Sequence, residues 1–263
     1  MSRFLAIFYG ACCYALFLVT FLYAIAFVTG AWVPKHIDSG QAGSLATALA
    51  INLGLLGLFA VQHSGMARPG FKRWWTRFVP GPIERSTYVL VSSLLLLALF
   101  WLWRPLPQVL WEIEHPAARM AIYGVSMLGW LLVLTSTFLI NHWELFGLRQ
   151  VWRSGQPLEQ ALEQPFVIRA LYRIVRHPMM LGFLIAFWSA PTMTVGHLLF
   201  AAATTGYIVV AVRFLEERDL LAQFGDTYRQ YQRRVPMLLP MGRRSRAPVD
   251  AAPGHGVAPG GLP

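Results

Sequence analysis

The chain has 263 residues, of which 56% are hydrophobic and 13% are charged, with a mean hydropathy of +0.49. Soluble domains carry about a quarter charged residues, so this composition excludes a soluble protein and indicates an integral membrane protein. The net charge of +10 would suit a nucleic-acid partner. However, the basic residues lie in short loops between apolar runs and in the tail. They do not form the basic stripes with interspersed aromatic residues that are typical of nucleic-acid binding.

Six apolar runs predict the helices of an all-α, multi-pass membrane bundle. They cover residues 4–33, 45–67, 87–103, 119–140, 179–190 and 195–215. The fifth run, about a dozen residues, forms roughly 18 Å of helix and is too short to cross a core of about 30 Å alone. We therefore expect five or six crossings, with the last two runs forming a helical hairpin. Residues 1–240 are predicted to form one domain, and the basic, Pro- and Gly-rich tail 241–263 is expected to be disordered.

Loop charge predicts the orientation of these helices. Basic residues concentrate in the loops 68–85 and 142–176, whereas the connections after the first and third runs have little net positive charge. The positive-inside rule places the two basic loops in the cytoplasm. Both termini and both polar ends of the hairpin are then cytoplasmic.

The two polar ends of the hairpin suit a small zwitterionic ligand that carries a sugar. Pro178 is well placed as the first residue of a helix, with His177 just outside it, and the free amide groups and dipole there favour a carboxylate. Arg176 strengthens that preference. Glu216 and Glu217 offer acceptors for a ribose diol, an ammonium or a sulfonium, and adjacent carboxylates at a membrane boundary are costly without such a partner. S-adenosylmethionine carries all of these groups, so a cytoplasmic cofactor pocket is expected here.

A simpler interpretation of the same residues is a cytoplasmic rim of charges with internal salt bridges. In that interpretation Arg213, four residues before Glu217, pairs with it on the helix surface.

Several motifs, taken in order, resemble the isoprenylcysteine carboxyl methyltransferase and phospholipid methyltransferase superfamily of membrane enzymes. They are Tyr172-x-x-x-Arg176-His177-Pro178-x-x-x-Gly182, Glu216-Glu217, Phe224-Gly225-x-x-Tyr228-x-x-Tyr231 and Arg233-Arg234-Val235-Pro236. Within this NnrU-related group, the chain is most similar to the bacterial methanethiol S-methyltransferases over most of its length. That similarity is carried by Gln62-His63-Ser64, by 141–151 (NHWELFGLRQV) and by 191–197 (PTMTVGH).

The resemblance implies a bacterial inner-membrane enzyme that methylates methanethiol with S-adenosylmethionine, giving dimethyl sulfide and S-adenosylhomocysteine. A volatile thiol and membrane lipid are the expected partners, and neither a metal nor nucleic acid is expected. Met180 stands where the isoprenylcysteine enzymes carry an aromatic hydroxyl. From the residues and the resemblance together, the cofactor site is expected to contain Tyr172, Arg176, His177, Pro178, Met180, Glu216 and Glu217.

The reacting thiol also requires assistance. Even a cysteine thiol has a pKa of about 8.5, so the enzyme must deprotonate its substrate or stabilise the anion. Arg213 is a candidate for stabilising the anion, and His63, His142 and His177 are equal candidates for the base.

Each of these assignments competes with a structural one. His63 shares a helix face with Asn52, which equally suits interhelical hydrogen bonding. His142 and Glu144 also suit solvated helix caps, and His197 is expected to be structural.

Three other functions stay open at the level of sequence. They are methylation of a prenylated thiol or carboxyl or of a phospholipid, a non-catalytic membrane relative, and a transporter or structural membrane protein. A transporter would more often show internal repeats and broken midplane helices, and the sequence shows neither.

Overall fold

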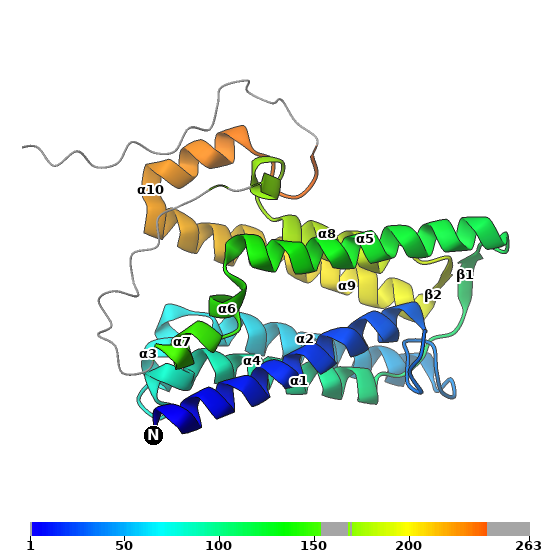
Figure 1. The fold of residues 1–263 in the computed structure, drawn as a ribbon. Coiled ribbons are helices and arrows are strands. Elements are labelled where there is room, and N and C mark those ends of the chain that lie inside the picture. The colour runs from blue at the N-terminus through cyan, green and yellow to red at the C-terminus, as the bar shows by residue number, and fades with distance from the viewer. Residues whose placement is uncertain (1, 154–167, 169, 241–263) are drawn as a thin grey trace, which may run out of the picture.

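The computed structural model describes residues 2–153, 168 and 170–240, so the predicted disordered tail 241–263 lies outside the described residues. Long helices form two layers (Figure 1). One layer contains α1 (Arg3–Thr29), α2 (Leu45–Met66) and α4 (Glu84–Leu102), and the other contains α5 (Pro116–Ile140), α8 (Pro178–Trp188) and α9 (Val195–Ala211). Among the described residues, five helices are long and apolar enough to cross a membrane, and α8 is a shorter apolar helix. The chain is a multi-pass membrane protein, as its composition predicted.

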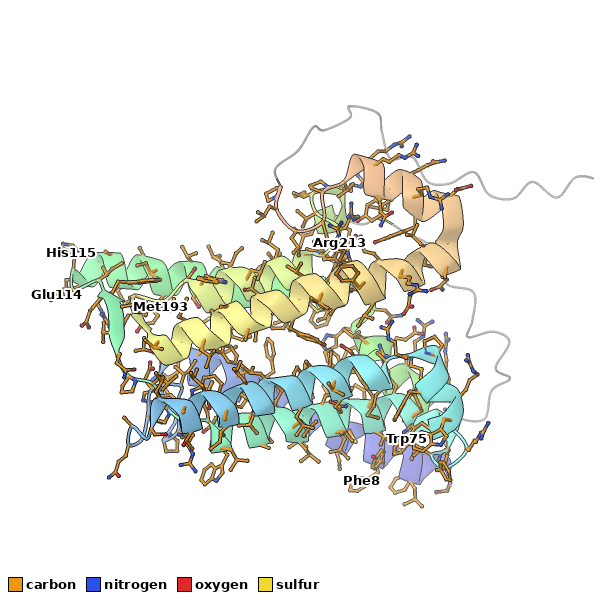
Figure 2. All side chains as sticks on the ribbon, turned by 180° about the vertical axis from the view of Figure 1, so that it is seen from behind. Phe8, Trp75, Glu114, His115, Met193 and Arg213 are labelled. Atoms are coloured by element: carbon orange, nitrogen blue, oxygen red, sulfur yellow. The ribbon has the colours of Figure 1, made fainter. Side chains whose placement is uncertain are left out.

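The remaining helices, turns and strands close the two ends of the bundle. At one end lie α3 (Pro69–Trp75), η1 (Gly81–Ile83), α6 (His142–Leu145), α7 (Leu148–Trp152), η3 (Ala170–Arg173) and α10 (Glu217–Arg234). At the other end β1 (Val109–Glu112) pairs antiparallel with β2 (Thr192–Thr194), in the register Trp111↔Met193. We call these the junction end and the strand end. Figure 2 shows Glu114, His115 and Met193 at the strand end, away from Trp75.

Capping residues explain where the first span ends. Ser2 accepts the amide of Leu5 at the start of α1, and Gly30 ends the helix in a left-handed conformation with φ of 72°. A residue without a Cβ adopts that conformation at little cost. The helix therefore ends at Thr29, before the end of the apolar run at residue 33.

Aromatic side chains fill the space between the two layers. Phe27 and Phe100 of the first layer lie with ring centroids 4.7 Å apart, and Phe27 also meets Phe200 of α9 edge-on at 6.2 Å. Phe200 in turn meets Phe187 of α8 at 5.0 Å. These rings are buried, and the two pairs that involve Phe200 have the edge-to-face geometry that is favourable for aromatic side chains.

Two glycines let α8 pack unusually close to α5. A Cβ on Gly129 would lie 2.6 Å from the Ala186 nitrogen, and one on Gly182 would lie 2.7 Å from the Gly129 oxygen. Small residues at such crossings allow backbones to approach in membrane helices. Gly182 belongs to the motif that contains His177 and Pro178, so this contact fixes the helix that presents those two residues.

Helices α9 and α10 are continuous through one π-helical turn, η4 (Val212–Glu216). Gly225 then bends α10, with φ of 54° and ψ of −127°. This conformation is essentially restricted to glycine. The bend allows Tyr228, Tyr231 and Val235 to pack with Leu221 and Phe224 in a small core of their own.

Candidate functional site at the junction end

Polar side chains from three segments meet at the junction end. Arg176 and His177 precede α8, Glu216 and Glu217 lie where the π-turn joins α10, and the second half of α10 folds back over them. The segment after α10 closes the arrangement, because Arg176 N donates to Pro236 O (2.8 Å) and His177 N donates to Met237 O (3.1 Å). We call Arg176, His177, Glu216 and Glu217 the junction cluster.

The carboxylate of Glu217 is enclosed by donors. Its Oε1 accepts from Arg176 Nε at 2.7 Å and lies 3.2 Å from His177 Nε2 and 3.5 Å from the Tyr228 hydroxyl. Its Oε2 accepts from Gln232 Nε2 at 3.1 Å. The side chains of Arg176 and Glu217 are only 10% and 9% exposed. This buried pair holds the junction together, since each charge satisfies the other.

Arg176 is also bonded to the backbone of α10's end. Its Nη1 donates to Gln232 O at 2.9 Å and to Val235 O at 2.6 Å. The guanidinium thus joins Glu217 to the end of the helix that folds over it. Its predicted contact with a cofactor carboxylate stays a prediction, and the observed contacts assign it a structural role.

His177 lies between both carboxylates. Its Nε2 faces Glu217, and its Nδ1 lies 3.5 Å from Glu216 Oε1. Burial favours the neutral imidazole, but the bonds to Glu216 and Glu217 outweigh burial and raise the pKa of His177 to about 9. The imidazole is therefore cationic at neutral pH and is a poor base there.

Glu216 is half-exposed, and the first amide groups of α8 have no intrahelical acceptor. The Glu216 side chain is 47% exposed, in contrast to Glu217. Helix α8 begins at Pro178 with His177 as its N-cap, as the sequence predicted. Its first intrahelical bond runs from Leu181 N to His177 O, so the amide groups of Met179 and Met180 precede the bonded part of the helix.

Tyr172 and Met180, two further predicted site residues, have contacts that the structure describes. Burial, followed by the carboxylate of Glu216, raises the pKa of Tyr172, which places its phenol near Glu216. Tyr172 is held by its backbone, because Tyr231 donates to its carbonyl oxygen at 2.6 Å. The side chain of Met180 packs against the core of Ile208, Val212 and Leu238.

The simpler interpretation, a charge rim in which Arg213 pairs with Glu217, is wrong about that pair. Glu217 pairs with Arg176 and His177, and Arg213 is exposed without an ion pair in the described part of the chain (Figure 2). The physical reason is the π-turn, which spans both Arg213 and Glu216. A π-turn inserts an extra residue, so residues four apart no longer lie directly above one another on the helix surface.

His142 is buried and fully bonded. Its Nε2 lies 2.7 Å from the Tyr14 hydroxyl, and its Nδ1 lies 2.7 Å from Thr137 Oγ1. Phe138 stacks on the ring at 4.1 Å. The interpretation of His142 as a solvated cap is wrong, since it is 2% exposed. Its contacts tie α1 to the end of α5 and leave no ring nitrogen for a substrate.

Other candidates have structural partners. Asn52 bonds twice to the backbone of Arg104, through Nδ2 to O at 2.8 Å and through Oδ1 from N at 2.9 Å. His197 is buried with Nε2 2.8 Å from Phe187 O. His63 lies on α2 beside Tyr88 of α4, whose hydroxyl is 3.0 Å from Nδ1. Sequence reasoning missed Tyr88, although a tyrosine inside an apolar run is a signal of an interior polar contact.

Comparisons with known proteins agree with the motifs of this site. The family model of the NnrU protein matches residues 51–243. Methanethiol S-methyltransferase of Mycobacterium tuberculosis is 58% identical over 247 residues, 93% of this chain and 99% of that protein. The chain belongs to the NnrU family and, within it, to the methanethiol S-methyltransferases.

Two further members of this family support the assignment. Methanethiol S-methyltransferases 1 and 2 of Bradyrhizobium diazoefficiens are 58% and 52% identical over 92% and 95% of this chain. These alignments cover 84% and 98% of the two relatives. No solved structure matches the chain significantly. The matched segment includes the junction cluster, all of α4 and the part of α2 from residue 51 onward.

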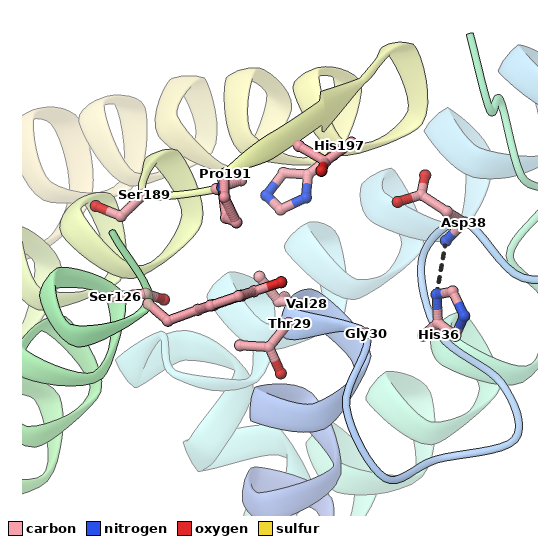
Figure 3. Close-up of a pocket in the computed structure, with 12 residues that line it drawn as sticks. Val28, Thr29, Gly30, His36, Asp38, Ser126, Ser189, Pro191 and His197 are labelled. Carbon is pink, nitrogen blue, oxygen red and sulfur yellow. Dashed lines mark hydrogen bonds between the residues drawn. The ribbon is translucent and has the colours of Figure 1, made fainter. Parts of the chain in front are cut away.

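A separate cavity of about 90 Å³ lies at the strand end (Figure 3). His36, Asp38, Ser126, Pro191 and His197 are among the residues that line it. No group of three metal-ligating side chains converges there or elsewhere within the described ranges. Helix α9 separates this cavity from the junction cluster, because His197 lies in its first turn and Glu216 ends the π-turn η4 that follows it.

Proposed function

We propose that this protein transfers the methyl group of S-adenosylmethionine to methanethiol, releasing dimethyl sulfide and S-adenosylhomocysteine. The observation that carries the proposal is the 58% identity, over nearly the full length, to a protein named methanethiol S-methyltransferase. The junction cluster supports it, because its open groups match the polar groups of that cofactor. A sulfonium methyl group supplies the electrophile, and the protein supplies position, charge and a path for the proton.

The described residues fit the cofactor in charge and in hydrogen-bonding capacity. Glu216 is half-exposed and offers acceptor oxygens for a ribose diol or an ammonium. The free amide groups at the start of α8 offer donors for a carboxylate, favoured by the helix dipole. The Nδ1 atom of cationic His177 lies 3.5 Å from Glu216 Oε1, so His177 orients the Glu216 carboxylate. In this proposal Tyr172, Pro178 and Met180 border the cofactor. Arg176 and Glu217 form the buried ion pair that holds the surrounding segments together.

The exposed Arg213 is the residue we assign to stabilise developing thiolate charge. Its side chain has no ion pair within the described residues, and it belongs to the same π-turn as Glu216. A positive charge placed before the reaction stabilises an anion without reorganisation during the chemical step. This assignment rests on position and charge alone.

We further propose that the junction end faces the cytoplasm of a bacterial inner membrane. The positive-inside rule supports this orientation, and the basic loop 68–85 lies at the junction end, as Trp75 shows in Figure 2. A reporter fused after Arg77 should be cytoplasmic, and one fused after Glu114 should be external. The opposite result for both fusions would place the cofactor site on the wrong side of the membrane.

Competition between two thiols tests the proposed substrate. Membranes containing the protein are given S-adenosylmethionine, methanethiol and a farnesylated thiol, and the methylated products are quantified. Dimethyl sulfide should predominate, and the Michaelis constant for methanethiol should be high, because each buried CH₂ contributes only about 0.8 kcal/mol. Membranes carrying Glu216→Ala serve as the matched control for background chemistry. Preferential methylation of the farnesylated thiol would refute the small-thiol assignment and favour a prenyl substrate.

A further inference from the structure

A polar cluster lies inside the membrane-crossing helices and is separate from the junction cluster. Its members come from α2, α4 and α9, and they are Gln62, His63, Ser64, Tyr88, Ser92 and Tyr207. Gln62 and Ser92 bond to each other at 3.3 Å. Polar and ionisable side chains at membrane depth are costly and mark functional interiors more often than surfaces. We call this set the intramembrane cluster.

The intramembrane cluster borders the helix that carries Glu216. Ser64 Oγ and the Tyr207 hydroxyl lie 3.0 Å apart, which joins α2 to α9 one residue after His63. Four residues after Ser64, just past the end of α2, Arg68 Nη1 bonds Asp219 Oδ2 of α10 at 2.8 Å. These two bonds lie on either side of the π-turn in sequence. The end of α2 is therefore fixed alongside the segment that positions the two carboxylates.

The three candidate bases differ in how their nitrogens are occupied. His142 has a separate hydroxyl 2.7 Å from each nitrogen, and cationic His177 faces a carboxylate on each side. For His63, a single hydroxyl, that of Tyr88, lies 3.0 Å from Nδ1 and 3.1 Å from Nε2. One hydroxyl bonds only one nitrogen well at a time. Ser92 Oγ lies 3.4 Å from Nδ1, so among the residues that the structure describes Nε2 has no hydrogen-bond partner of its own.

We propose that His63 accepts the proton of the thiol substrate and that Tyr88 is the positioning residue that orients its ring. This inference rests on the proposed methyl transfer. The electron pair of the S–H bond forms the new bond from sulfur to the methyl carbon, and the proton passes to a ring nitrogen of His63. The bond between the methyl carbon and the sulfonium sulfur breaks, and its electron pair stays on that sulfur. The positive charge thus moves from the sulfonium to the imidazolium, which then releases the proton to water.

Tyr88 is suited to both protonation states of His63. Its hydroxyl also lies 3.3 Å from the His63 carbonyl oxygen, so it can donate there while its oxygen accepts from a protonated ring. Phe59 stacks on the His63 ring with centroids 5.1 Å apart, and the Tyr88 ring lies with its centroid 5.3 Å away. The His63 ring thus contacts two aromatic side chains that restrict its orientation, and general-base catalysis requires a fixed orientation.

Thiol acidity distinguishes this role from a structural one. The pair of substrates is ethanethiol and 2,2,2-trifluoroethanethiol, which are similar in size but differ in acidity because fluorine withdraws electrons. A more acidic thiol depends less on a base. His63→Gln should lower kcat/KM for ethanethiol by about 100-fold and for the fluorinated thiol by much less. Tyr88→Phe should act in the same direction, by about 10-fold for ethanethiol, with the thiol KM little changed.

S-adenosylhomocysteine affinity, measured by calorimetry in detergent, should be unchanged in both variants. His142→Gln is the matched control, because a buried structural histidine should affect both thiols equally. If His63→Gln does not fold, Tyr88→Phe and His63→Asn provide the same comparison. Equal losses for the two thiols in variants that retain cofactor affinity would overturn the inference. A wild-type protein that binds S-adenosylhomocysteine but methylates no thiol would overturn the proposed function together with it.

Discussion

The two ends of the bundle bury polar groups with different partners. At the strand end, buried or half-buried side chains bond to the backbone: Lys35 Nζ donates to Ser39 O and Trp103 O, Asn52 bonds Arg104, and His197 bonds Phe187 O. At the junction end, Glu217 is surrounded by side chains, and two of its partners carry charge.

The difference separates a structural closure from a site that can respond to ligands and pH. Backbone carbonyls do not titrate, so the acceptors of these strand-end bonds keep the same charge at every pH. The junction end depends on pairs of opposite charges. Removing one member of a buried pair leaves the other charge buried without a partner. It also leaves Glu216 half-exposed. Five predictions test this contrast, beginning with the largest expected effect.

Glu217→Gln should destabilise the protein by about 3–5 kcal/mol, the usual cost of removing one member of a buried ion pair. Arg176 and His177 would keep their charges without the carboxylate that now bonds both. Thermal unfolding in detergent measures the change. The control is Asp219→Asn, whose pair with Arg68 is 48% and 31% exposed and should contribute about 1 kcal/mol or less. Similar losses of stability in the two variants would show that the buried Arg176–Glu217 pair contributes no more than the exposed Arg68–Asp219 pair.

Raising the pH should weaken the junction end through His177. Its pKa is about 9 in the folded protein and about 6.5 in an unfolded chain. The stabilisation is therefore complete below about pH 6.5 and is lost as the pH rises through 9. The loss should be on the order of 3 kcal/mol, at 1.36 kcal/mol per pKa unit. Melting temperatures of wild type and His177→Gln across this pH range measure the loss. If the melting temperature of the variant fell with pH as steeply as that of wild type, a group other than His177 would cause the effect.

Glu216→Ala should weaken S-adenosylhomocysteine binding by roughly 10- to 100-fold, because a hydrogen bond to a charged group contributes about 1.5–3 kcal/mol. Stability should change little, since this side chain is half-exposed. Calorimetric titration in detergent gives the affinity, and Glu114→Ala at the strand end is the control. Unchanged affinity in Glu216→Ala would remove this residue from the cofactor site.

Gly129→Ala should destabilise the protein by about 1–3 kcal/mol, the usual cost of overpacking. The added Cβ would lie 2.6 Å from the backbone of Ala186, which forces α5 away from the helix that begins at Pro178. Gly124→Ala, on the same helix, is the matched control, because its Cβ would meet nothing within 4 Å. Thermal unfolding compares the two, and equal stabilities would show that α8 accommodates the shift.

Thr194→Val should cost about 1 kcal/mol, as the loss of an N-cap typically does. Its hydroxyl accepts from His197 N at 3.1 Å and donates to Asp38. Cofactor affinity should not change, because these contacts lie at the strand end. A weakened affinity for S-adenosylhomocysteine would show that the two ends are coupled and would remove the contrast between them.

Local features of the sequence predicted much of this arrangement. The hydrophobic runs predicted the long helices, because apolar length is set by composition alone. Pro178 predicted the start of α8, because proline favours the first helical position. The glycine of Phe224-Gly225 was part of the recognised motif, and its conformation of φ 54° explains why glycine is required there.

Partner choice was not predictable in the same way. Arg213, four residues before Glu217, was its partner in the simpler charge-rim interpretation, whereas the observed partner, Arg176, is 41 residues away. The antiparallel pairing of β1 and β2, with residues 82 positions apart in register, also lay outside an all-α prediction. Both contacts depend on how the chain returns on itself, which local periodicity does not encode.

The sequence by itself determined the membrane class, the family and the residue types of the junction cluster, because composition and short motifs are properties of neighbouring residues. Only the tertiary structure decided which charged side chains are paired in buried contacts within the protein and which remain exposed. It paired Arg176 with Glu217, left Glu216 half-exposed and filled both nitrogens of His142. Those outcomes follow from the π-turn, the bend at Gly225 and the close α5–α8 packing, which bring distant segments to within bonding distance.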